Sequence, residues 1–224
     1  MQKPDTTLDP HALRHNLFSS ISHLVGALAA GLGLAPLLRL AAGRAPLLFV
    51  GKVYVASVVL AFGASAIYHW FDREDEGNGL LRRIDHAAIF VLIAGTYTPV
   101  AFVFLDGGWR WSVLGVQWGV AILGMALKLV RADLPRAFTV GLYLAMGWFA
   151  LVPLRPLLHT MPASAFVLML AGGVAYTIGA LIYAVRRPSP LPGLVDFHGL
   201  FHLFTLAGAG LHYALVYVTL SAAA

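Results

Sequence analysis

The fold class of this chain is decided by residues 47–70, LLFVGKVYVASVVLAFGASAIYHW. Lys52 is the only Lys, Arg, Asp or Glu in this stretch. A transmembrane helix needs about 20 mostly apolar residues, because the hydrocarbon core of a bilayer is about 30 Å thick and a helix rises about 1.5 Å per residue. Residues 47–70 therefore predict a membrane-spanning helix.

Apolar runs of the same kind recur along the chain. They cover residues 17–41, 84–105, 109–130, 138–158, 163–185 and 197–220. Together with residues 47–70 they predict an all-α membrane protein with seven transmembrane helices. Residues 1–15 are expected to form a polar N-terminal tail, and residues 16–224 the seven-helix transmembrane domain.

Composition supports a membrane protein and limits the chemistry. The chain is 59% hydrophobic and 11% charged, whereas soluble domains carry about 25% charged residues. Its net charge of +5 comes from basic residues in short loops, which indicates anionic lipid headgroups as partners and not nucleic acid. Without cysteine, the chain has no disulfide or thiolate site, so any metal must be held by His and carboxylate.

The distribution of Lys and Arg predicts the orientation, since cytoplasmic loops are enriched in both. The side that holds the N-terminus carries ten: Lys3, Arg14, Arg73, Arg82, Arg83, Lys128, Arg131, Arg136, Arg186 and Arg187. The other side carries four: Arg39, Arg44, Arg110 and Arg155. We therefore expect a cytoplasmic N-terminus and, with seven spans, a C-terminus outside.

Ionisable groups from three predicted helices meet at one depth on the cytoplasmic side. His69 ends the second helix, Asp85 begins the third, and His198 and His202 begin the seventh. His198 and His202 are four residues apart, so they share one helix face and suit a single metal ion. Ser65 stands at the same spacing before His69. Ionisable residues within membrane helices are costly and usually functional.

Three imidazoles and a carboxylate are a suitable set for Zn²⁺. Three protein ligands leave one position open for water, which Asp85 can hold and deprotonate, while Ser65 supplies a further hydrogen bond. A different divalent metal stays open. The pair reads HGLFH, without a Glu after the first His, so it is not the soluble metalloprotease motif.

Simpler interpretations remain for the individual residues. A single His or Asp beside Arg often serves as an interfacial anchor. His23 lies at a depth suited to supporting the metal ligands, His86 points about 100° away from Asp85, and His212 has no assigned role. Asp196 is expected to cap the last helix.

Four segments together resemble a known family. They are SHLVG at residues 22–26, SAIYH at 65–69, RIDH at 83–86 followed by IAGTYTP at 93–99, and HGLFH at 198–202. The chain resembles the hemolysin III branch of the progestin and adipoQ receptor family, which includes the adiponectin receptors. Ser22 stands where that family usually has Thr, and it keeps the hydroxyl.

The resemblance implies seven helices, a cytoplasmic N-terminus and a zinc ion near the cytoplasmic face. The family's zinc-binding His match His69, His198 and His202. Its Asp on the zinc-bound water matches Asp85, and its second-helix Ser matches Ser65. Related membrane hydrolases, including alkaline ceramidases, carry a similar set.

The leading hypothesis is a zinc-dependent hydrolase of a lipid amide or ester, which releases a free fatty acid and acts in lipid homeostasis of the cell's inner (plasma) membrane. Whether the protein is an enzyme stays open, because zinc can instead be structural in a receptor-like sensor of membrane state with a protein partner. A pore, as the historical name hemolysin suggests, is disfavoured because the sequence has no ring of charges. A transporter is disfavoured because its charges do not lie at the midplane.

Overall fold

The computed structural model describes residues 10–72, 79–130, 134–191 and 195–223. Most of the predicted tail, residues 1–9, lies outside them, as do Lys3, Arg73 and Arg131 of the charge count. Apart from an isolated bridge between Leu191 and Val195, the described residues form helices and their connections, and no strand. The predicted all-α class is confirmed.

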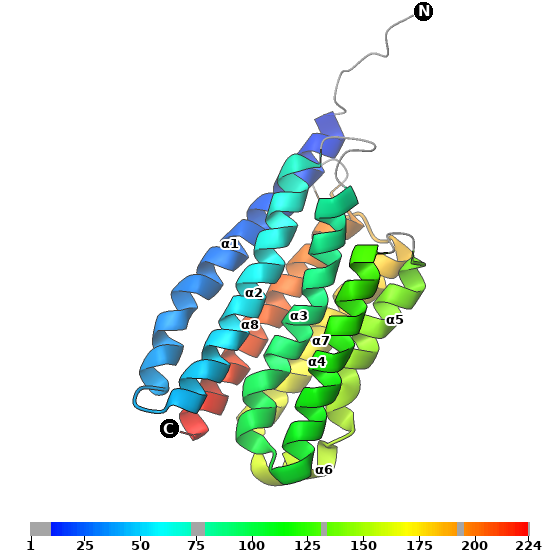
Figure 1. The fold of residues 1–224 in the computed structure, drawn as a ribbon. Coiled ribbons are helices and arrows are strands. Elements are labelled where there is room, and N and C mark those ends of the chain that lie inside the picture. The colour runs from blue at the N-terminus through cyan, green and yellow to red at the C-terminus, as the bar shows by residue number, and fades with distance from the viewer. Residues whose placement is uncertain (1–9, 73–78, 131–133, 192–194, 224) are drawn as a thin grey trace, which may run out of the picture.

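The helices run roughly side by side along one axis (Figure 1). They are α1 Pro10–Leu40, α2 Ala45–Phe71, α3 Gly79–Phe104, α4 Gly107–Val130, α5 Arg136–Gly147, the short 3-10 helix η1 Trp148–Leu151, α6 Leu154–Thr160, α7 Ala163–Val185 and α8 Phe197–Ala222. The start of α1 and the end of α8 lie at opposite ends of the bundle (Figure 1). An odd number of crossings fits that arrangement.

Six helices in the described residues are long and apolar enough to span a membrane. They are α1 from Asn16, α2, α3, α4, α7 and α8. A bent pair, residues 136–151 and 154–160, makes a seventh span if it crosses as one unit. Six predicted runs thus match single helices to within a few residues, with two exceptions: α1 begins seven residues before the predicted 17, within the predicted tail, and α3 begins five residues before the predicted 84.

The fifth run, predicted as residues 138–158, is broken and not continuous. Its two parts meet at a bend of 52°. Pro153 and Pro156 lack the N–H that would continue the helical hydrogen bonds. Just before the prolines, the Tyr97 hydroxyl bridges two backbone groups of the segment: it donates to the Gly147 carbonyl at 2.7 Å and accepts from the Ala150 N–H at 2.7 Å.

This broken segment follows α3 along its length. The Tyr143 hydroxyl donates to the His86 carbonyl at 2.6 Å, near the start of α3. Tyr97 contacts Gly147 halfway along, and the Thr160 hydroxyl donates to the Phe104 carbonyl at 2.7 Å, at the end of α3. The segment from α5 to α6 therefore extends along the bundle over the same length as α3.

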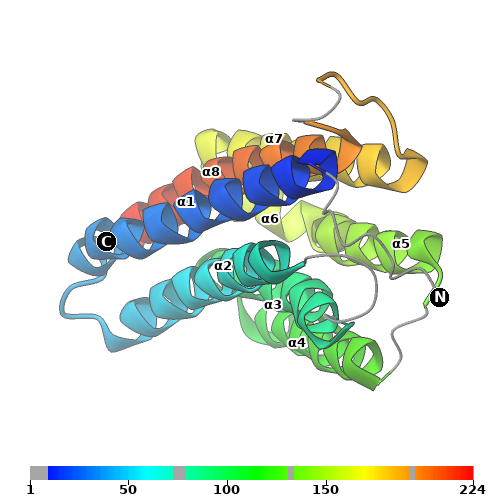
Figure 2. The ribbon, with the colours of Figure 1, turned by 90° about the horizontal axis from the view of Figure 1, so that it is seen from above.

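α3 is the central helix of the bundle. In its apolar part 61% of the residues are buried, against 11% in α1. Viewed from above, α1 to α4 follow one another while α7 lies against α8 (Figure 2). Gly95 of α3 faces Ser57 of α2 so closely that a Cβ would collide with its hydroxyl. Outward side chains such as Leu32, 79% exposed, and Leu123, 72% exposed, suit a lipid surface.

Candidate metal centre

The beginning of α8 fixes two of the three histidines. The Asp196 carboxylate accepts hydrogen bonds from the backbone N–H groups of His198 at 3.0 Å and Gly199 at 2.8 Å. This N-cap satisfies donors that the first helical turn cannot pair internally. The predicted role of Asp196 is confirmed, and His198 and His202 follow on successive turns of one face.

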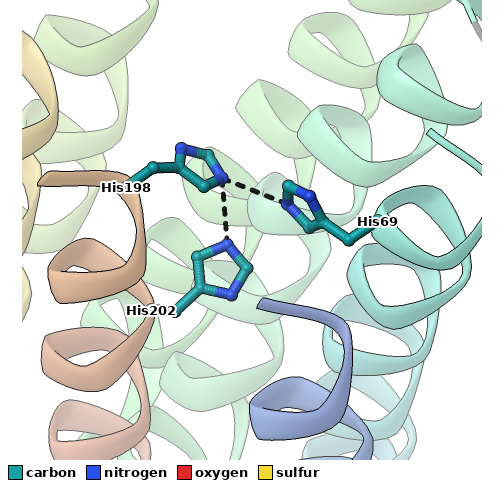
Figure 3. Close-up of side chains that lie close together, drawn as sticks. All are labelled: His69, His198 and His202. Atoms are coloured by element: carbon teal, nitrogen blue, oxygen red, sulfur yellow. Dashed lines mark hydrogen bonds between the residues drawn. The ribbon is translucent and has the colours of Figure 1, made fainter. Parts of the chain in front are cut away.

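The third histidine comes from α2, and the three rings point toward one another (Figure 3). His198 Nε2 lies 3.1 Å from His69 Nε2 and 3.1 Å from His202 Nε2. One ligand atom of each residue falls within 4.8 Å of the others. In a tetrahedral zinc site with Zn–N near 2.0–2.1 Å, two nitrogens are about 3.3 Å apart. The donor set and its spacing therefore fit such an ion.

A hydrogen-bond chain from α1 orients the His69 ring. His69 Nδ1 lies 3.3 Å from Asn16 Oδ1, and the Asn16 amide donates to the Asp72 carbonyl at 2.8 Å. With Nδ1 donating, the lone pair is on Nε2, the atom that faces the other histidines. Metal-binding histidines commonly carry such a partner on the second nitrogen. The sequence pattern by itself does not indicate this role for Asn16.

His202 is packed from α1 by His23. The two rings stack with centroids 3.8 Å apart and planes 24° apart. His202 is 1% exposed and His23 is 4% exposed. Neither ring nitrogen of His23, nor Nδ1 of His202, has a hydrogen-bond partner among the described residues. Buried polar atoms normally have partners, so this cluster fits a site that also holds a ligand or ordered water.

Ser65 and Asp85 lie in the same cavity wall as the histidines. Ser65 precedes His69 by one turn of α2 and is 4% exposed, and Asp85 on α3 is 9% exposed. The Ser65 hydroxyl is close enough to the Asp85 carboxylate to interact with it. Both side chains line the cavity that the three histidines also line, and their chemical roles stay predictions.

The other two unassigned histidines differ in position. His86 also lines the cavity, one residue after Asp85. His212 lies ten residues beyond His202 on α8, which is about 15 Å along the axis. Its Nε2 lies 3.3 Å from the Met169 carbonyl of α7, and its ring fills the space beside Gly172. His212 therefore joins α7 to α8 and is not a member of the cluster.

A cavity of about 780 Å³ connects the cluster to the interior of the bundle. It is lined along α3 from Arg82 to Ala101, about 28 Å at the helical rise, nearly the thickness of a hydrocarbon core. Its far part is apolar, lined by Val100, Val113, Leu157 and Leu215. The arrangement can hold a long apolar chain whose polar end lies at the histidines.

Known proteins are similar to this chain over most of its length. A sequence model of the family described as haemolysin-III related matches residues 11–213. Hemolysin-3 of Bacillus cereus is 31% identical over 208 residues, 91% of each chain. The Hemolysin-3 homolog of Bacillus subtilis (strain 168) is 28% identical over 88% of this chain and 90% of its own. An adiponectin receptor protein of Drosophila melanogaster is 24% identical over 73% of this chain and 40% of its own.

Proposed function

Because the chain belongs to the haemolysin-III-related family and gathers three imidazoles in one cluster, we propose that it is a zinc-dependent hydrolase of a lipid amide or ester. The observation that carries this proposal is the cavity that joins the histidines to a long apolar chamber. The acyl chain of the lipid lies in that chamber, and the products include a free fatty acid. The protein acts in membrane lipid homeostasis.

The protein crosses the cell's inner (plasma) membrane seven times, with the N-terminus and the zinc site on the cytoplasmic side. Ten counted Lys and Arg on that side against four on the other support this orientation. The bonds that join the segment from α5 to α6 to α3 along its length support counting it as the seventh span.

Each polar residue of the site has a distinct role. His69, His198 and His202 hold the zinc, and zinc, when bound, polarises the carbonyl and makes water a better nucleophile. Asp85 accepts a proton from the attacking water and returns it to the departing nitrogen or oxygen. Ser65 donates a hydrogen bond that orients the carboxylate. Asn16 and His23 hold two of the imidazoles in place.

Metal analysis of the detergent-purified protein tests the site. Mass spectrometry is expected to find about one zinc per chain in the wild type and none in His202→Ala. A well-folded wild type without zinc would overturn the proposal. If zinc is present, Asp85→Asn is expected to abolish turnover of lipid amides and esters while zinc content stays constant. Turnover by Asp85→Asn at the wild-type rate would refute the assigned role of Asp85.

One observation favours a second candidate, in which zinc is structural and the protein senses membrane state. The three-histidine cluster joins α2 to α8, two helices that otherwise contact each other little. In that case a chelator lowers the melting temperature of the wild type by several degrees, whereas Asp85→Asn leaves cellular function intact. Loss of cellular function in Asp85→Asn, at full zinc content, would exclude this candidate.

A further inference from the structure

Lys128 is a buried cation at the same end of the bundle as the histidines. The charge pattern assigned it to the cytoplasmic interface, yet it is 4% exposed and lines the cavity from α4. Its ammonium has no hydrogen-bond acceptor or carboxylate partner in the part of the chain that the structure describes. A cation that lines a cavity at membrane depth is costly to leave without a counter-charge, so Lys128 is suited to an anionic ligand that enters this cavity.

Other cationic side chains line the cavity beside it. Arg83 Nη1 donates to the Leu129 carbonyl at 3.1 Å, which fixes the end of α4 against the start of α3. Lys128 therefore stands level with the first turns of α3. From those turns, Arg82 and His86, which are one turn apart, also line the cavity.

Arg136 brings a third permanent cation from α5 to the cavity. Its guanidinium lies 4.5 Å from the centroid of the Tyr183 ring and donates to the Tyr183 carbonyl at 3.1 Å. The Tyr183 ring is in turn 5.6 Å from the ring of His198. Tyr183 thus holds Arg136 in a fixed position next to the metal centre.

We propose that Arg82, His86, Lys128 and Arg136 form a basic pocket that binds the phosphate of a lipid headgroup. This inference rests on the proposed hydrolase function. The substrate of that hydrolase is then an anionic phospholipid-type amide or ester. Three permanent charges favour a doubly charged phosphate monoester over a single carboxylate, and guanidinium suits phosphate oxygens. Asp85 precedes His86 on α3 and lines the same cavity as this pocket and the histidines, so the headgroup would be anchored in the chamber where the bond is cleaved.

Binding of dodecyl phosphate to the purified, zinc-loaded protein in dodecyl maltoside tests the pocket. This detergent carries the same tail on a neutral headgroup. Inorganic phosphate and dodecanoate are the comparison ligands, and titration calorimetry gives the affinities. We expect dodecyl phosphate to bind tightest and Lys128→Met to weaken it by about tenfold or more, because a hydrogen bond to a charged group is lost. Lys128→Arg should retain binding.

Arg155→Gln is the matched control, since Arg155 is exposed on α6 at the other end of the bundle. It should bind dodecyl phosphate as the wild type does. Zinc content and melting temperature of Lys128→Met should not fall, because nothing in the described structure pairs with that charge. If Lys128→Met does not fold, Arg136→Gln takes its place and the same weakening is expected.

Three outcomes would overturn the pocket. If Lys128→Met and Arg155→Gln bound dodecyl phosphate with equal affinity, Lys128 would not contribute to binding the phosphate. If inorganic phosphate bound as tightly as dodecyl phosphate, the pocket would be a site for the free ion. If dodecanoate bound as tightly, the pocket would be a carboxylate site. Dodecyl phosphate has no amide or carboxylic ester, so these results do not depend on turnover, and the hydrolase proposal can fail or stand separately.

Discussion

Asn16 determines how the His69 ring is oriented in the three-histidine cluster. Its amide carbonyl is the partner of His69 Nδ1, and its NH₂ group is fixed by the Asp72 carbonyl. The side chain therefore selects the ring nitrogen that faces His198 and His202. A partner of this kind, once removed, commonly lowers metal affinity without removing a ligand.

Replacing Asn16 with leucine should therefore weaken zinc binding by about 10–100-fold. Competition with a chromophoric chelator on the purified protein measures the change. Asn16→Asp, which keeps an acceptor for Nδ1, should stay within a few-fold of the wild type. Unchanged affinity in Asn16→Leu would mean that the ring is held by packing alone.

At the scale of single residues, the sequence identified the three histidines of the cluster better than the residues that contact them. His69, His198 and His202 could be predicted as a group because imidazoles are rare at membrane depth and helix periodicity gives their faces. Asn16 and Lys128 could not, because their roles depend on which helix each one meets. Lys128 stands near the end of an apolar run, as an interfacial anchor would. Only the packing of the helices shows that its side chain faces the cavity.

Among the elements, the segment from α5 to α6 departs most from its prediction. Hydropathy indicated a continuous helix over residues 138–158, since apolar content is high throughout. Two prolines in the second half prevent a continuous helix, and the backbone groups at the break need partners inside the membrane. Tyr97 and Gln117 supply them: Gln117 Nε2 donates to the Met146 carbonyl at 2.9 Å.

Removing the Tyr97 hydroxyl should destabilise this bend. Tyr97→Phe leaves the Gly147 carbonyl and the Ala150 N–H without their shared partner, at a cost of about 1 kcal/mol or more in the free energy of unfolding. Unfolding in mixed micelles with increasing dodecyl sulfate measures it. Tyr217→Phe, at a side chain that is 42% exposed on α8, should change stability by less than about 0.5 kcal/mol. Equal effects of the two substitutions would contradict the role of Tyr97.

For the whole molecule, the absence of cysteine makes the orientation directly testable. Asp106 lies in the α3–α4 turn with its side chain 90% exposed, and Ser189 is exposed in the connection from α7 to α8 at the other end. In spheroplasts, Asp106→Cys should react with a membrane-impermeant maleimide, because the proposed topology places it outside. Ser189→Cys should react only after permeabilisation, and the wild type is the blank. The reverse pattern would invert the topology and move the metal centre to the outer face.

The sequence by itself determined the helices and the pairing of His198 with His202. In a bilayer an apolar segment has to satisfy its own backbone hydrogen bonds, so long apolar runs become helices whatever surrounds them. Helix periodicity then fixes which side chains share a face. The tertiary structure alone decided that α2 brings His69 to α8, that Tyr97 bridges the broken fifth segment, and that Lys128 faces the cavity. Periodicity states which residues lie together on one helix, whereas the contact between two helices depends on the packing of the whole bundle.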